Sequence, residues 1–225
     1  MIDMQDVAYS YGQGRGDLLA GMTLHLMPGT FHFLTGPSGA GKTTFLKLCY
    51  AELLPTAGAM TLFGHDASAL TRDQIALLRR KVGVVHQDCQ FLDHLTVAEN
   101  VALPLTLAGQ SMDADAIRDL LAWVGLSPLA NAYPPQLSGG ERQRAALARA
   151  VILSPDLILA DEPTGNLDWE MSMRLLQLLI ELNKSGKAVL IATHDLNLIR
   201  AAKQQVAARV LRISGKHLQL AGADL

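Results

Sequence analysis

The sequence predicts an α/β fold built around a mostly parallel sheet, and three observations support this prediction. Short apolar runs alternate with helical patterns along most of the chain, which is typical of parallel strands covered by helices on both faces. A glycine-rich loop joins a strand to a helix at residues 36–43. Residues 89–135 break the alternation with helical periodicity alone. We therefore expect a single domain over residues 1–225, with a small helical insert at about 89–135.

The first third of the chain predicts strands and turns, which we expect to form an antiparallel β part. Residues 7–11 are a short β-like run, and residues 17–34 hold two strand-like runs separated by a Met-Pro-Gly turn at 27–29. The apolar spacing over residues 43–53 predicts the helix that follows the glycine-rich loop. Residues 55–67 then predict a turn, a strand and another turn.

The rest of the chain carries the alternation and the helical insert. Residues 94–133 have helical periodicity that we expect to be interrupted near Pro104 and Gly109. Ser138 is followed three residues later by Glu141, the spacing of a capping box, so a helix should begin there. The remaining expected elements are a helix over 71–81, strands over 82–85, 157–160 and 188–192, helices over 171–183 and 196–203, and a closing hairpin over 206–220.

Composition excludes several classes of protein. The 225 residues are 49% hydrophobic and 18% charged, which suits a chain with a buried core. The net charge of −2 gives no basic field for nucleic acid. Cys49 and Cys89 lack the spacing of a zinc or redox site, and the first residues lack an apolar leader. Because no run is long enough to cross a membrane, we expect a cytoplasmic protein whose membrane role depends on a partner.

The glycine-rich loop has the spacing G-x-x-x-x-G-K-[ST], which binds a nucleotide phosphate chain. Its glycines let several backbone N–H groups point inward, and the following helix adds its positive end. A lysine supplies a point charge at the β and γ phosphates, and the next hydroxyl can bind Mg²⁺. A plain glycine-rich turn would not match all defining positions. The expected nucleotide-binding residues are Gly36, Pro37, Ser38, Gly39, Ala40, Gly41, Lys42, Thr43 and Thr44.

Two acidic residues follow the apolar strand at 157–160. Asp161 can hold its carboxylate beside Mg²⁺, and Glu162 can polarise the attacking water as a general base. An Asp-Glu pair at a strand end is weak support alone. It becomes strong beside a phosphate loop, because the carboxyl ends of neighbouring parallel strands converge.

The run LSGGERQR at 137–144 predicts a second anion site, since a serine and two glycines open a helix. One nucleotide does not need two such loops from one chain. A nucleotide bound to a second chain could, however, use the anion site at 137–144. Residues 138–142 match the signature of the ATP-binding cassette (ABC) ATPases, and the chain resembles that family from Tyr11 to about Leu220. This motif is far more specific than the phosphate loop.

The resemblance implies a homodimer that sandwiches ATP between the phosphate loop of one subunit and the signature of the other. It implies that Tyr11 stacks on adenine, although Tyr9 is an alternative. It also implies that Gln87 contacts Mg²⁺ and the γ-phosphate side, and that His194 senses the γ-phosphate. The residues expected to reach the opposite subunit are Ser138, Gly139, Gly140 and Asp168.

In the run FLTGPSGAGKTTFLKL at 33–48, the chain most resembles the FtsE group of cell-division ATPases, whereas the ATPases of lipoprotein-releasing exporters share the run LADEPTGNLD at 159–168. That resemblance implies a membrane partner like FtsX, possible contacts with other division proteins, a place on the inner face of the cell membrane, and control of peptidoglycan hydrolysis. We expect the partner to bind near residues 87–100. The ATPases of lipoprotein-releasing exporters are the alternative, and a soluble ABC assembly module is an alternative of another class.

Overall fold

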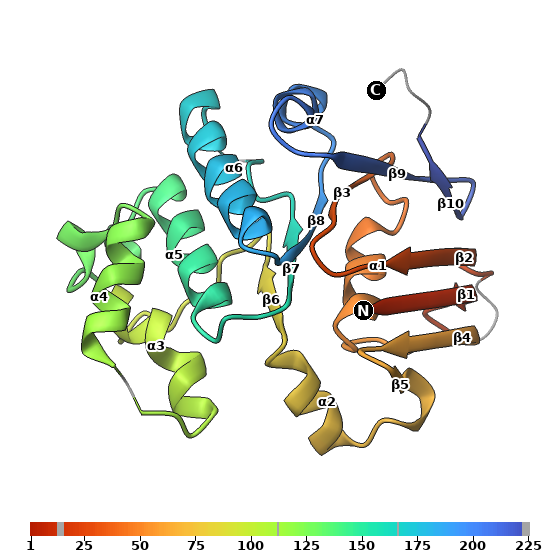
Figure 1. The fold of residues 1–225 in the computed structure, drawn as a ribbon, viewed down its shortest axis with the longest axis horizontal. Coiled ribbons are helices and arrows are strands. Elements are labelled where there is room, and N and C mark those ends of the chain that lie inside the picture. The colour runs from red at the N-terminus through yellow and green to blue at the C-terminus, as the bar shows by residue number, and fades with distance from the viewer. Residues whose placement is uncertain (13–15, 112, 166, 222–225) are drawn as a thin grey trace.

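The computed structural model describes residues 1–12, 16–111, 113–165 and 167–221, and these form two sheets (Figure 1). The smaller sheet is antiparallel, in the order β2-β1-β4-β5. Its strands are β1 (Ile2–Tyr9), β2 (Leu19–Leu26), β4 (Ala57–Leu62) and β5 (His65–Asp66).

The predicted first strand at residues 7–11 had the wrong bounds. β1 begins at Ile2, where buried Ile2 and Met4 alternate with less buried neighbours, and it ends at Tyr9. The polar residues Asp3 and Asp6 had hidden this pattern. Asp6 has a φ of 52°, and the pairing register shifts beside it, so the alternation does not run evenly to the strand end.

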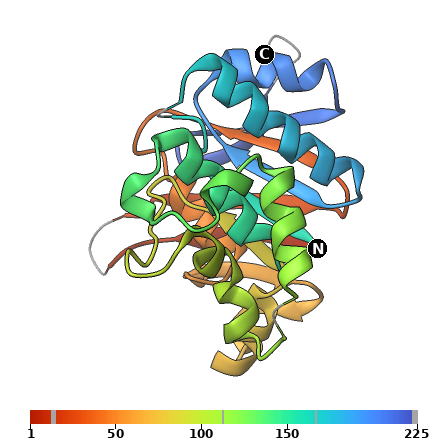
Figure 2. The same cartoon turned by 90° about the vertical axis from the view of Figure 1, so that its left-hand side faces the viewer.

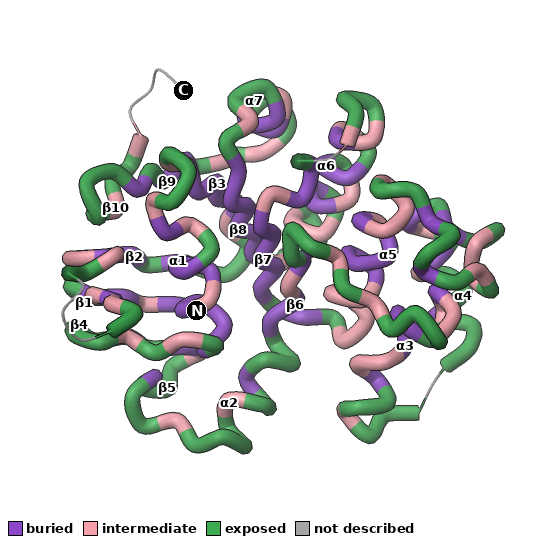
Figure 3. The backbone as a smooth tube through the Cα atoms, turned by 180° about the vertical axis from the view of Figure 1, so that it is seen from behind, coloured by how far each residue is buried: buried purple, intermediate pink, exposed green. Residues whose placement is uncertain are grey.

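The central sheet confirms the predicted mostly parallel arrangement, with the order β10-β9-β3-β8-β7-β6. The middle strands β7 and β8 are buried along their whole length, which is why their sequences are continuous apolar runs (Figure 3). The final β9–β10 pair is the predicted antiparallel hairpin. The strands are β3 (Phe31–Thr35), β6 (Val82–Val85), β7 (Leu157–Asp161), β8 (Ala188–Ala192), β9 (Ala208–Ser214) and β10 (His217–Leu220).

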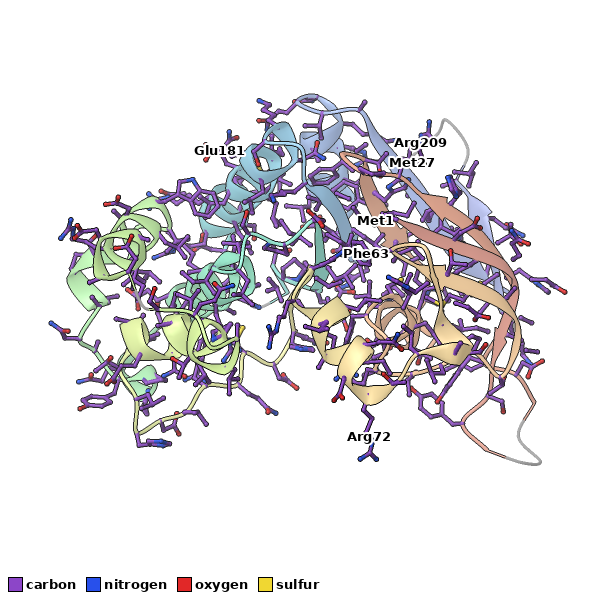
Figure 4. The ribbon with its side chains drawn as sticks, turned by 60° about the horizontal axis from the view of Figure 1, so that its bottom comes forward. Met1, Met27, Phe63, Arg72, Glu181 and Arg209 are labelled. Carbon is purple, nitrogen blue, oxygen red and sulfur yellow. The ribbon has the colours of Figure 1, made fainter. Side chains whose placement is uncertain are left out.

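Helices cover the central sheet on two sides. α1 (Lys42–Cys49) packs with the antiparallel sheet in one apolar cluster, whereas α5 (Gly139–Val151), α6 (Trp169–Lys184) and α7 (Leu196–Lys203) pack in another. α1 stops short of the predicted 43–53, and Ala51 beyond it has a φ of 55°. α2 (Arg72–Arg79) precedes β6, and Arg72 at its start projects into solvent (Figure 4).

The region predicted to be helical contains α3 (Val97–Leu107), α4 (Ala114–Trp123) and short 3₁₀ turns at Ser127–Leu129 and Pro134–Gln136 (Figure 2). The predicted interruption at Pro104 was wrong, because α3 continues through it. Pro104 lies in the last turn, where its ring removes one intrahelical hydrogen bond. Gly109, with a φ of 68°, follows the helix end.

α5 is shared between these helices and the sheet. Ala145 and Ala148 pack into the cluster of α3 and α4, whereas Ala146 and Leu147 pack onto the central sheet. The two apolar faces of one helix therefore join the helical region to the sheet. Among the described residues, we find no helix with the length and apolarity that a membrane crossing requires.

Candidate nucleotide-binding site

The loop between β3 and α1 has the backbone that its glycines predict. Gly36 has a φ of 153°, and a Cβ there would lie 2.8 Å from the carbonyl oxygen of Ile213. Gly41 has a φ of 97°, and a Cβ there would lie 2.7 Å from Cδ2 of Leu19. Gly41 is also the N-cap of α1 and provides no side-chain hydrogen bond to the helix start. The first N–H groups of α1 therefore remain able to bind an anion.

Lys42 is held over this loop by two contacts. Its Nζ donates to the carbonyl oxygen of Gly36 at 3.1 Å and lies 3.8 Å from Oε1 of Glu162. The side chains of Lys42 and Glu162 are only 12% and 13% exposed. The ammonium is therefore a shielded positive charge at the start of α1, where phosphate charge would be stabilised most.

Thr43 and Asp161, both expected beside Mg²⁺, are joined by a hydrogen bond across the site. The Thr43 hydroxyl donates to Oδ2 of Asp161 at 2.6 Å. Burial raises the pKa of the Asp161 carboxyl, and the hydrogen bond from Thr43 opposes this effect. A hydroxyl and a carboxylate are hard oxygen ligands, which suit Mg²⁺. Among the described residues, no group of three or more His, Cys, Asp or Glu side chains could hold a metal ion.

Glu162 links the loop to His194, which follows β8. Nδ1 of His194 lies 3.0 Å and 3.1 Å from the two carboxylate oxygens of Glu162. The backbone of Glu162 has a φ of 45° and its N–H donates to the carbonyl oxygen of Ala192 at 2.8 Å. Such a φ is strained for a residue with a side chain and is typical of functional positions. His194 is 76% exposed, so its ring faces the solvent side.

These groups surround one cavity of about 680 Å³, which is large enough for a small-molecule ligand. Sequence reasoning did not assign Leu18 or Gly165 to the site, although Gly165 lies within the run LADEPTGNLD, and Ala40 is not among the lining residues. The cavity is lined by Gly36, Pro37, Ser38, Gly39, Gly41, Lys42, Thr43 and Thr44 of the loop, together with Leu18, Gln87, Asp161, Glu162, Gly165 and His194.

The two tyrosines proposed for adenine lie in different environments. Tyr9 is 8% exposed and belongs to the core of the antiparallel sheet. Tyr11 is 58% exposed, and its hydroxyl lies 3.0 Å from Oγ1 of Thr44. Tyr11 does not line the cavity, but its accessible side chain lies beside Thr44, at the end of the phosphate loop. Its position favours Tyr11 over Tyr9.

The signature does not reach the cavity of its own chain. Ser138 caps α5 through the predicted capping box, with the Ser138 hydroxyl accepting from the Glu141 N–H at 3.4 Å and donating to the Glu141 carboxylate at 2.7 Å. Gly139 lines a separate cavity of about 530 Å³, which Gln87 also borders. Asp168 is the N-cap of α6, and its Oδ1 accepts from the N–H of Met171 at 2.8 Å.

Asp168 and the signature nevertheless lie near one another. A Cβ at Gly140 would be 3.5 Å from Cγ of Met171 and 3.6 Å from Cδ2 of Leu167. The starts of α5 and α6 therefore meet through these side chains. Of the expected residues, Ser138, Gly139, Gly140 and Asp168 lie outside the phosphate-loop cavity.

Comparison with known proteins agrees with this geometry. The model of the ABC transporter family matches residues 19–165. The cell division ATP-binding protein FtsE of Haemophilus influenzae is 46% identical over 89% of this chain and 93% of its own length. FtsE of Escherichia coli is 45% identical over 97% of both chains, and FtsE of Bacillus subtilis is 40% identical over 92% of both.

Two solved structures share the fold over nearly the whole chain. A dimeric post-hydrolysis state of the ATP-binding cassette MJ0796, bound to ADP and Pi, has a TM-score of 0.86, 32% identity and 98% coverage of both chains. A dimeric structure of MJ0796, described as a bacterial ABC transporter cassette, has a TM-score of 0.87 and 34% identity over 97% of both. With the loop, the acidic pair and the signature in place, the chain belongs to the ABC transporter family, as an ATP-hydrolysing, FtsE-like cassette.

Proposed function

We propose that this ATPase drives a membrane complex of bacterial cell division. In this proposal an FtsX-like integral membrane protein holds the cassette on the inner face of the cell membrane, with other division proteins as possible contacts. ATP-driven motion then passes through the membrane to regulate peptidoglycan hydrolysis. The names of the relatives support the division role. The observation that carries the motor role is the cavity in which Glu162 lies between Lys42 and His194.

ATP binding uses the loop and Lys42. The backbone N–H groups at the start of α1 surround the phosphates, and Lys42 turns from the carbonyl oxygen of Gly36 toward the β and γ phosphates. The accessible ring of Tyr11 stacks on adenine, because it stands beside Thr44 at the end of the loop.

Mg²⁺ would be held by Thr43 and Asp161, with Gln87 beside them at the cavity wall. When bound, it neutralises phosphate charge and orients the reacting oxygens. Asp161 is mostly buried, and burial raises its pKa, so a cation there would stabilise the ionised carboxylate.

Hydrolysis uses Glu162 and His194. Glu162 accepts a proton from the attacking water as the water oxygen bonds to the γ-phosphorus and the bond from that phosphorus to the β-γ bridging oxygen breaks. His194 holds the Glu162 carboxylate through Nδ1 and presents its exposed ring toward the γ-phosphate side. ADP and phosphate are the products.

ATP controls the opening and closing of a homodimer. Because the signature lies outside the cavity of its own chain, Ser138, Gly139 and Gly140 of a second copy complete the γ-phosphate site, and Asp168 crosses the interface. ATP favours the closed dimer because its γ-phosphate contacts both subunits. Cleavage removes that bridge, and the dimer opens.

The membrane partner docks beside the helical insert, which we propose as a subdomain over residues 89–135. The separate cavity of about 530 Å³ lies between residues 87–93 and the start of α5. Phe91 at its edge packs under two guanidinium groups, with Arg142 at 5.5 Å and Arg149 at 4.6 Å from the ring centroid. Gln87 borders both cavities, so a partner seated here contacts the segment that also touches the nucleotide.

The test is a pull-down from detergent-solubilised native membranes with the Glu162→Gln variant and ATP, followed by mass spectrometry. Lys42→Ala is the control, because it should not form the ATP-bound state. Enrichment of a small membrane protein that binds a cell-wall hydrolase or its activator supports the proposal. A lipoprotein-extracting permease pair, or the absence of any ATP-dependent membrane partner, contradicts it.

A further inference from the structure

An exposed indole marks the start of α6. Trp169 is the first residue of that helix, and 53% of its surface is accessible. Large aromatic side chains bury much apolar area when covered, and they are enriched at the centres of protein interfaces. The phosphate chemistry described above does not use Trp169.

The backbone beneath Trp169 is firmly positioned. Asp168 caps the helix through its bond with the N–H of Met171 at 2.8 Å. Met171 in turn touches Arg144 of α5, with its sulfur 3.2 Å from a guanidinium nitrogen. The start of α6 is therefore fixed to the helix that begins with the signature, and α5 and α6 lie side by side (Figure 1). A rigid aromatic anchor loses little conformational entropy when a partner covers it.

The residues that flank Trp169 in the sequence are charged and exposed. Asp168 on one side and Glu170 on the other are exposed, and Glu170 pairs with Arg174 at 2.7 Å. Trp169 is thus an apolar group with charged neighbours, the arrangement of an interface anchor inside a polar rim.

The occupant that fits this surface is a second copy of the chain. Asp168, next to Trp169, and the signature beside Met171 belong to the proposed nucleotide site but lie outside the cavity of their own chain. Two solved structures of the ATP-binding cassette MJ0796, which share this fold, are described as dimeric. We infer that Trp169 is an aromatic anchor of the ATP-bound homodimer, covered by the partner subunit when the dimer closes. This inference rests on the proposed function.

Dimer affinity tests the inference in the Glu162→Gln background, where ATP should trap the closed state. Sedimentation velocity with ATP should show that Trp169→Ala weakens dimerisation about tenfold or more, the effect of truncating an interface anchor. Leu77→Ala is the matched control: Leu77 is 57% exposed but lies on α2, far from the start of α6 (Figure 1). Circular dichroism checks that each variant is folded.

Fluorescence supplies a second readout, because the chain has two tryptophans. Trp123→Phe leaves Trp169 as the reporter in the same Glu162→Gln background. Its emission should shift to shorter wavelength with ATP, as the ring leaves water, and should not shift with ADP.

The outcomes separate this inference from the proposed function. Loss of affinity in Trp169→Ala but not in Leu77→Ala, together with the ATP-dependent shift, supports the anchor. Normal ATP-dependent dimerisation of Trp169→Ala, or an unchanged emission in a dimer that forms, overturns the anchor and leaves the dimer proposal standing. No ATP-dependent dimer with Trp169 intact overturns the proposed dimer, and the anchor with it.

Discussion

Replacing Glu162 by Gln should separate ATP binding from hydrolysis. Glu162 is 3.8 Å from Nζ of Lys42 and 3.0 Å from Nδ1 of His194, in a setting where its side chain is 13% exposed. Gln has nearly the same shape, so the cavity should keep its form. Gln cannot accept the proton of the attacking water, so the variant loses the proposed general base.

The rate effect is set by that lost base. Positioned general bases contribute about 10²- to 10⁴-fold, which corresponds to about 3 to 5 kcal/mol in the activation barrier. We therefore expect the turnover rate at saturating ATP to fall by at least about a hundredfold, measured by phosphate release.

ATP affinity should behave differently. At 3.8 Å the gross attraction of Lys42 and Glu162 is about 4 kcal/mol with an effective dielectric constant of roughly 20. Desolvation of both groups offsets most of this attraction. Because Gln removes the carboxylate that competes with phosphate for Lys42, the dissociation constant for ATP should stay equal or fall. Titration calorimetry with ATP checks this. Normal turnover, or a large loss of ATP affinity, would refute the assigned role of Glu162.

Three further predictions rest on single positions. Lys42→Ala should weaken ATP binding at least about tenfold in calorimetry, whereas Lys47→Ala, outside the cavity, should not. Burial lowers the pKa of His32, so the unfolded chain takes up a proton at this side chain before the folded chain does as pH falls through about 6.5. Denaturant titrations at several pH values should show that the free energy of unfolding falls toward acid pH and that His32→Leu makes this fall smaller. An equal fall in the His32→Leu variant would contradict this. Gly83→Ala should destabilise the fold by about 1 to 3 kcal/mol, because its Cβ would lie 2.3 Å from a carbonyl oxygen of α5; Gly12→Ala, with open space around it, should be near neutral in the same denaturation assay.

The central sheet was largely predictable from the sequence. The apolar runs at 82–85 and 188–192 and the helix at 196–203 have the bounds that the pattern predicted. Polar or helix-capping residues stand at both ends of each segment, so the apolar pattern left no doubt about where each one begins and ends. The edge strand β1 was harder, because its polar residues interrupt the apolar pattern and Asp6 disturbs the register. Pro104 misled because α3 continues through it despite the lost hydrogen bond, while Val101 and Ala102 of the same helix pack into the apolar cluster of the helical region.

The site was predictable where topology decides and unpredictable where side-chain placement decides. Asp161 and Glu162 meet the phosphate loop because parallel strands bring their carboxyl ends together. Tyr9 and Tyr11 could not be separated by sequence, since they would share one face if the strand continued. The strand stops at Tyr9, and only Tyr11 is exposed. The exposure of Trp169 likewise depends on what neighbouring helices cover, which periodicity does not give.

The contacts within the site also explain how hydrolysis can depend on both ATP and a second subunit. In this structure Lys42 is engaged by the carbonyl oxygen of Gly36 and by Glu162, while Glu162 also holds His194. In the proposed mechanism, the phosphates of ATP draw Lys42 away from Glu162 before that carboxylate accepts a proton from water. The signature that would order the γ-phosphate lies outside this cavity. A single chain can therefore bind ATP yet lack part of the proposed catalytic site, so turnover per subunit should rise with protein concentration until the dimer is saturated.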